Sequence, residues 1–152
     1  MKIYNTNQEI GCRILLMLGT IKNEYSLERI IYYDYFSLHL NDLEKEYVGL
    51  HPSNPNHSSE IIIKRNTIQN AILYLFRKGL LEVTYNLSGF KYKNTELGNH
   101  VIEMLDNDYS FKYRECVKKV DKYFGNMKDD DIMNYVTSNI EKWTGQFESE
   151  GK

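Results

Sequence analysis

Residues 61–95 read IIIKRNTIQNAILYLFRKGLLEVTYNLSGFKYKNT, and this stretch decides the fold. Its first part has apolar residues at helical spacing and ends at Gly79, which predicts a helix stopped by a left-handed glycine. Two strands are expected at residues 80–85 and 90–93, because Asn86-Leu87-Ser88-Gly89 between them is a hairpin signal. A helix followed by a tight hairpin is the ending of a winged-helix domain.

The helix expected in this segment begins after Ser58 or Ser59, either of which can cap it. Its expected buried stripe consists of Ile61, Ile68, Ile72, Leu75 and Phe76. Residues 71–76 are apolar on every side, which predicts that the C-terminal half of the helix is enclosed. Only the first half is then expected to offer a polar face, around Lys64, Arg65, Gln69 and Asn70.

The same segment is basic, although the chain as a whole is acidic. It has one acid, Glu82, against six cations: Lys64, Arg65, Arg77, Lys78, Lys91 and Lys93. Its net charge is therefore +5, whereas the whole chain carries −2 and the remainder −7. A local basic field of this kind predicts a surface that faces a polyanion or an acidic partner.

The candidate patch is formed by the cations near the start of the helix and on the hairpin, where winged helices often touch DNA. These cations are Lys64, Arg65, Lys91 and Lys93. Direct sequence-specific DNA binding is one interpretation, but the patch is modest and the acidic remainder of the chain repels DNA. The alternatives are contact with an acidic protein surface and support for a DNA contact made mainly by another subunit.

Two helices are expected before this segment, at about residues 7–22 and 27–38. Thr6 opens a capping box for the first, and Ser26 is the expected N-cap of the second. Residues 39–60 have no helical or strand periodicity, which predicts a long, ordered loop.

Three helical segments are expected after the hairpin, the first of them capped by Thr95. The other two have amphipathic stripes: Tyr113, Val117, Val120 and Phe124 in one, and Ile132, Val136, Ile140, Trp143 and Phe147 in the other. The predicted fold class is mainly α with a small β-hairpin, a winged helix-turn-helix with a C-terminal helical extension. Residues 1–106 are the expected winged-helix domain, with the long loop 39–60, and residues 107–152 the extension.

Composition narrows the class of protein further. The chain has 152 residues, 41% of them hydrophobic, which suffices for one core. No apolar run approaches the ~20 residues that cross a bilayer, and the N-terminus has no secretory apolar region. Cys12 and Cys116 have no metal or redox spacing and are expected to be reduced and buried. A cytoplasmic protein with no membrane partner is expected.

Three blocks of the sequence resemble one known family. They are Leu27-Glu28-Arg29-Ile30-Ile31-Tyr32-Tyr33-Asp34-Tyr35 with His39 and Asp42; Leu50-His51-Pro52-Ser53-Asn54-Pro55 with Glu60 and Arg65; and Arg77-Lys78-Gly79-Leu80 with the hairpin and Thr95-Glu96-Leu97. Together they are similar to the middle-component proteins of bacterial ABC-three component systems, over about residues 7–124. These are small winged-helix subunits encoded between an effector protein and an ABC ATPase of the chromosome-maintenance and repair type.

The resemblance implies membership of an anti-phage defence complex of the Lamassu kind. The chain is then expected to be a non-catalytic adaptor without cofactors that links the DNA-sensing ATPase of its operon to the effector. Non-specific DNA contact within the complex is expected to accompany these two partners. The alternative function, from another class, is a stand-alone winged-helix transcriptional regulator that reads a palindrome as a homodimer.

The candidate partner-binding residues are Tyr32, Tyr33, Asp34, Tyr35, His51, Pro52 and Trp143. For Asp34, the readings are a general base, a partner contact, or a structural carboxylate paired with an arginine such as Arg65 or Arg29. No nucleophile or phosphate loop accompanies it, which favours the structural role. No metal site is expected either, because the histidines match no standard ligand spacing and neither cysteine is near them. The stripe containing Trp143 is either an interface or part of the chain's own core.

Overall fold

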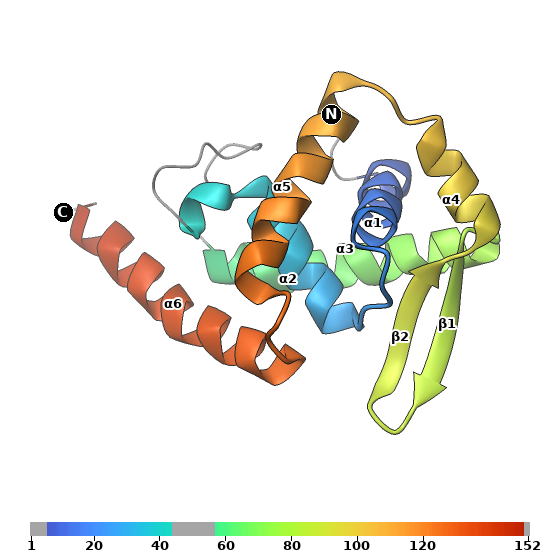
Figure 1. The fold of residues 1–152 in the computed structure, drawn as a ribbon. Helices are drawn as coiled ribbons and strands as arrows, with labels where there is room; N and C mark the ends of the chain where they lie inside the picture. Colours follow the sequence, from blue (N-terminus) through green and yellow to red (C-terminus); the bar gives the residue numbers. More distant parts are fainter. Residues whose placement is uncertain (1–5, 44–56, 151–152) are drawn as a thin grey trace.

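The computed structural model describes residues 6–43 and 57–150, with side chains described for 6–43 and 60–139 (Figure 1). Within these residues the fold is mainly helical with one small antiparallel hairpin, as predicted. The elements are α1 (Asn7–Ile21), α2 (Leu27–Leu38), the 3₁₀ turn η2 (Leu40–Asp42), α3 (His57–Arg77), β1 (Leu81–Asn86), β2 (Gly89–Asn94), α4 (Glu96–Glu103), α5 (Asp108–Phe124) and α6 (Asp129–Glu150).

Side-chain caps set the start of four helices. Thr6, Ser26 and Thr95 accept the backbone N–H three residues on, which confirms the three N-caps predicted for α1, α2 and α4. Asn107 does the same for α5, through Ser110 N at 2.8 Å. Each cap satisfies a backbone donor that the first turn of a helix leaves without a partner.

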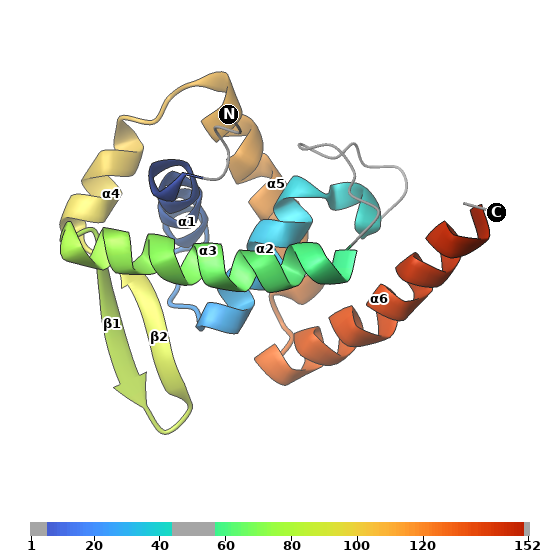
Figure 2. The ribbon, with the colours of Figure 1, turned by 180° about the vertical axis from the view of Figure 1, so that it is seen from behind.

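The hairpin follows α3 after Gly79, whose φ of 74° lies in the left-handed region as predicted. β1 pairs with β2 from Leu81 opposite Asn94 to Asn86 opposite Gly89. β1 is therefore shifted by one residue from its prediction, and β2 is one residue longer at each end. Tyr25, between α1 and α2, adds an isolated bridge to Tyr92 on the edge of β2. The hairpin is thereby fastened to the helices at its base, while its tip extends away from them (Figures 1 and 2).

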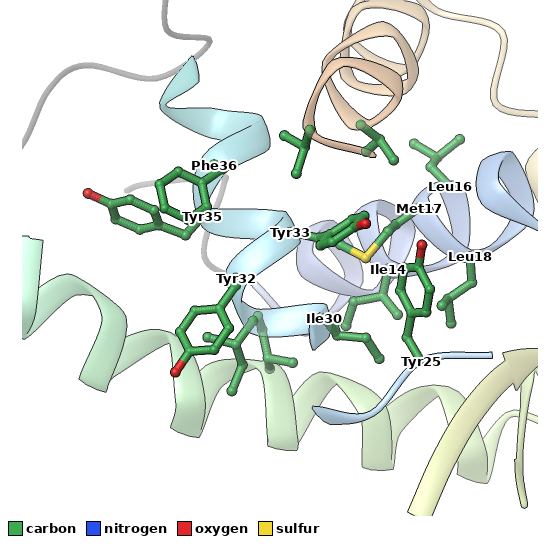
Figure 3. Close-up of a cluster of buried hydrophobic side chains, with 14 of the residues drawn as sticks. Ile14, Leu16, Met17, Leu18, Tyr25, Ile30, Tyr32, Tyr33, Tyr35 and Phe36 are labelled. Atoms are coloured by element: carbon green, nitrogen blue, oxygen red, sulfur yellow. The ribbon is translucent and has the colours of Figure 1, made fainter. Parts of the chain in front are cut away.

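The core forms where α1 and α2 meet α3 on one side and α5 on the other. Figure 3 shows Tyr33 of α2 beside Met17 and Ile14 of α1, while Tyr32 points toward α3. α5 and α6 contribute Tyr113, Val117, Val120, Phe124, Ile132 and Val136 to the same buried cluster. The boundary predicted near residue 106 falls between α4 and α5, and the buried cluster continues across it.

The prediction for α3 is wrong in two respects. The helix begins at His57, before Ser58 and Ser59, which were expected to cap it. Ala71, Ile72 and Leu75 are buried, but Leu73 is 47% exposed and Phe76 is 52% exposed, so the C-terminal half is not enclosed. Only one face of α3 packs on α1 and α2, because the helix lies across the outside of the molecule (Figure 2). A helix that is apolar on every side therefore leaves part of its apolar surface facing out.

No helix among the described residues is long and apolar enough to span a bilayer.

Candidate functional site

Asp34 of α2 lies at the centre of a buried ion-pair junction, with no exposed surface. Arg13 of α1 donates to both carboxylate oxygens, from Nε to Oδ1 at 2.9 Å and from Nη2 to Oδ2 at 3.2 Å. Lys64 of α3 donates to Oδ2 at 2.9 Å, and the Tyr113 hydroxyl of α5 donates to Oδ1 at 2.6 Å. One carboxylate thus joins four helices.

The electrostatics of the junction favour an ionised Asp34. Burial alone would raise the pKa of this carboxyl, but the positive charges of Arg13 and Lys64 and the hydrogen bonds hold its pKa well below the usual range. Burial also raises the pKa of the Tyr113 hydroxyl, which therefore stays protonated and donates. A general base needs a pKa near the working pH and access to a substrate, so this arrangement favours the structural role of Asp34.

Asp34 is paired with an arginine, as the structural interpretation expected, but with Arg13 instead of Arg65 or Arg29. The assignment of Lys64 to an exposed basic patch is also corrected. Its side chain is buried against Asp34, so it is not available for contact with a phosphate or a partner. The sequence showed that Arg13 and Lys64 lie on helices, but nothing local revealed that both charges turn inward.

A second polar cluster joins α2 to the turn between α5 and α6. Arg29 donates to the carbonyl oxygens of Phe124 at 2.7 Å and Met127 at 2.8 Å, and pairs with Asp129 at 3.1 Å. The Tyr33 hydroxyl donates to Asp121 of α5 at 2.8 Å. These contacts fix the start of α6 against α2.

The tyrosines predicted as a partner-binding surface lie inside the molecule (Figure 3). Tyr33 and Tyr35 have no exposed surface, and Tyr32 is only 6% exposed. The Tyr35 hydroxyl donates to Asp42 at 2.6 Å, which ties α2 to η2. Side chains without exposed area cannot form a docking surface, so their assignment as direct partner contacts is corrected to a structural one.

The rest of the predicted basic patch is also partly neutralised. Arg65 makes a two-pronged ion pair with Glu28, and Lys93 pairs with Glu82 at 3.1 Å across the hairpin. Lys91 makes no ion pair within the part of the chain that the structure describes. Of the four predicted patch residues, three therefore have a carboxylate partner.

Three of the predicted contact residues lie outside the described part of the chain: His51, Pro52 and the side chain of Trp143. Of the last helix's stripe, Ile132 and Val136 are buried in the chain's own core.

His39 lies close to Glu60, with 2.7 Å between Nε2 and Oε1. Among the described side chains, no three His, Cys, Asp or Glu residues are placed to hold a metal ion.

Sequence reasoning missed the apolar part of one exposed surface, which we call the outer face of α3. It consists of Ile62, Ile63, Asn66, Gln69, Asn70, Leu73, Phe76 and Arg77, all of them exposed. Ile62 is 65% exposed, although the residue two positions on, Lys64, is buried. The signal was present in the sequence, because α3 has more apolar residues than a single packed face can bury.

The hairpin tip adds a second exposed apolar group. Tyr85 is 74% exposed and stands opposite Phe90, with 4.9 Å between the ring centroids. Leu87, in the turn between them, is also fully exposed. The tip is thus aromatic and apolar, and the cations of the hairpin lie on its other face, because Lys91 and Lys93 alternate with Phe90 and Tyr92.

Two clefts open on the described surface. The larger, of about 890 Å³, lies between the end of α1, β2 and α4 and includes Lys22, Asn94, Glu103 and Arg114. The smaller, of about 430 Å³, is polar and lies beside Arg29 and Asp121. Both are lined by side chains of mixed charge.

Comparison with known protein families identifies the family to which this chain belongs. The family of ABC-three component system Middle Component 2 matches the chain over residues 3–146. The chain belongs to this family. The match extends beyond the three blocks of resemblance and includes most of α6. No curated protein and no solved structure matches the chain. As a Middle Component 2 protein, it is a component of an ABC-three component defence system, whose other components are its partners.

Proposed function

We propose that this Middle Component 2 protein is a non-catalytic adaptor in a cytoplasmic anti-phage complex of the Lamassu kind. It links an ABC ATPase of the chromosome-maintenance and repair type to an effector protein. In this proposal α1, α2, α3 and the hairpin act as a winged-helix unit, and α5 and α6 are its helical extension. Family membership supports the setting, because it implies partners from the same system.

The observation that carries the proposal is the character of the outer face of α3 and of the hairpin tip. In a DNA-binding winged helix, the corresponding elements meet the duplex, and cations dominate the contact. Here the exposed side chains on these elements include Leu73, Phe76, Tyr85 and Phe90. Exposed apolar patches of this kind mark protein–protein contacts.

The pairing of the basic residues supports the same conclusion. Lys64, Arg65 and Lys93 each have a carboxylate partner within the chain, so their charges are already offset. A phosphate would have to displace these carboxylates, which weakens the case for DNA as the main ligand. DNA contact by the remaining cations would add to an assembly that protein contacts hold together.

An adaptor transmits a signal only if it binds two states of a neighbour with different affinity. The Asp34 junction suits such a role, because it ties α1, α2, α3 and α5 together through buried charged groups. A push on α3 from one neighbour would therefore move α5 with it. The protein acts in this proposal as a rigid connection between two binding surfaces.

Co-purification tests the proposal. We expect this chain, tagged and co-expressed with the other genes of its operon, to retain both the ATPase and the effector through size-exclusion chromatography. The competing function, a stand-alone regulator, predicts that the chain elutes without them. It also predicts a tight, discrete gel-shift complex between the isolated chain and its own promoter, and that pair of results would overturn the proposal.

A further inference from the structure

The outer face of α3 has the geometry of a helix-docking seam. Ile62, Asn66, Gln69, Leu73 and Phe76 follow at intervals of three or four residues, and all five are exposed. Residues at this spacing form one continuous strip along a helix, about 21 Å long at 1.5 Å per residue. Large apolar side chains stand at both ends of the strip and amide side chains at its middle.

The unpaired charge near this strip has one sign. From Ile61 to Gly79 the sequence contains no acid, and of its cations Lys64 and Arg65 are paired with Asp34 and Glu28. Arg77 and Lys78, at the end of the strip beside Phe76, make no ion pair with any described residue. The C-terminal end of the strip is therefore apolar and positively charged.

These features discriminate between occupants. DNA fits poorly, because the strip itself presents aliphatic, aromatic and amide groups, and cations only at one end. A second copy of this chain pairing through the same strip also fits poorly. It would bring no carboxylate to Arg77 and Lys78, since the acid nearest in sequence on α3, Glu60, is engaged by His39. The occupant has to supply both apolar side chains and acids.

We infer that the outer face of α3 docks an acidic amphipathic helix belonging to another component of the same system. Its apolar side chains, spaced at i, i+3 or i+4, and i+7, pack between Ile62, Leu73 and Phe76. Its carboxylates meet Arg77 and Lys78, where the charge is complementary. This inference rests on the proposed function, because the docked helix belongs to a partner in the complex.

Charge and apolar contact can be tested separately. Phe76→Glu removes the largest apolar side chain of the strip and adds a like charge for an acidic ligand. Phe111→Glu is the matched control, because Phe111 is 65% exposed on α5, on the other side of the core from α3. We expect Phe76→Glu to weaken binding of the isolated chain to whichever of the purified ATPase and effector it binds by roughly tenfold or more, and Phe111→Glu to leave this binding within about twofold.

Arg77→Glu tests the charge, with Lys122→Glu, an exposed position on α5, as its control. We expect Arg77→Glu to weaken the same binding and to reduce its dependence on salt. Far-UV circular dichroism and the melting temperature of each variant show that the chain still folds. Equal binding by Phe76→Glu, Arg77→Glu and the unaltered chain would overturn the inference, whereas failure of the unaltered chain to bind any component would overturn the proposed function.

A photo-crosslinking amino acid at position 73 identifies the occupant directly in the purified complex. The expected product joins Leu73's position to a segment of another component that has acids on one face and apolar residues on the other. A crosslink to DNA or to a second copy of this chain would overturn the inference. The crosslink tests only the occupant of the strip, because the purified complex has already formed in either case.

Discussion

Among single residues, the fold depends most on Asp34, a buried carboxylate that pairs with two buried cations. Asp34 receives hydrogen bonds from Arg13, Lys64 and Tyr113, and has no contact with solvent. A buried ion pair contributes little compared with an apolar core, but removing one partner leaves the other charge buried and unpaired. This asymmetry makes the junction a sensitive point of the molecule.

Asp34→Asn is therefore expected to lower the free energy of unfolding by about 3–5 kcal/mol, because it removes the buried negative charge that Arg13 and Lys64 share. Urea denaturation followed by circular dichroism measures the loss. The control is Glu82→Gln, which breaks the half-exposed pair with Lys93 and should cost less than about 1 kcal/mol. Equal small losses for both variants would contradict this account of the junction.

Acid should remove the contribution of Asp34. Burial alone would raise the pKa of Asp34 in the folded protein, but the charges of Arg13 and Lys64 lower it further than burial raises it. In the unfolded chain the pKa of an Asp is about 3.9. A carboxyl whose pKa is lowered by folding stabilises the fold above its unfolded pKa and loses that effect as the pH falls. We expect the stability difference between the unaltered chain and Asp34→Asn to be constant from about pH 7 to 5 and to shrink below about pH 4. Denaturation at a series of pH values checks this, and a difference independent of pH would count against it.

At the scale of elements, close packing places α4 at the base of the hairpin. A Cβ added at Gly98 would lie 2.2 Å from the backbone oxygen of Leu80, a contact that neither helix nor turn can relieve by moving a side chain. The sequence offers no sign of this requirement, since Gly98 lies in the first turn of a helix, where the chain accepts most residue types.

Gly98→Ala is expected to destabilise the protein by about 1–3 kcal/mol, despite the better helix propensity of alanine. His100→Ala, an exposed position two residues on in α4, is the control and should change stability by less than about 0.5 kcal/mol. Thermal unfolding of the two variants gives the comparison. A Gly98→Ala protein as stable as the unaltered chain would show that α4 is free to move away from Leu80.

Periodicity and capping signals were sufficient to predict the order of the elements. Thr6, Ser26 and Thr95 cap their helices as expected, and Gly79 ends α3 in the left-handed conformation. Burial was harder to predict, because it depends on which face meets a neighbour. Lys64 looked like a surface cation and is buried by an acid thirty residues away, while Phe76 looked like a core residue and is exposed.

The candidate site shows the same limit. The tyrosines of α2 were assigned to a surface, because tyrosine suits interfaces, yet their hydroxyls are satisfied inside by acids such as Asp42 and Asp121. These partners are distant in sequence or belong to a different helix, so spacing alone could not reveal them. The apolar residues on the outer face of α3 were instead expected to be buried, since an all-apolar segment gives no indication of which side faces out.

At the scale of the whole molecule, the C-terminal helices belong to the same packed unit as the hairpin-bearing part. Arg29 accounts for much of this connection, because it reaches from α2 to the carbonyl oxygens of Phe124 and Met127 and to Asp129. Its guanidinium also lies over the rings of Tyr25 and Tyr33, at 4.9 and 5.2 Å from their centroids.

Arg29→Lys keeps the charge but cannot reach several acceptors at once, so we expect it to loosen the start of α6. Amide hydrogen exchange in residues 129–139 should become faster by an order of magnitude or so, while amides of α1 keep their protection. Arg114→Lys is the matched control, since Arg114 donates to a carbonyl oxygen of α4, that of Ile102, instead of to the turn before α6. Unchanged exchange in α6 of Arg29→Lys would mean that apolar packing alone holds this helix.

If this chain connects the ATPase to the effector, the two proteins should not stay together without it. The most direct measurement is the intact mass of the assembly formed by the ATPase and the effector, co-expressed with and without this chain. We expect one species containing all three proteins when the chain is present, and separate ATPase and effector species when its gene is omitted. An ATPase–effector assembly that forms equally well without the chain would contradict it.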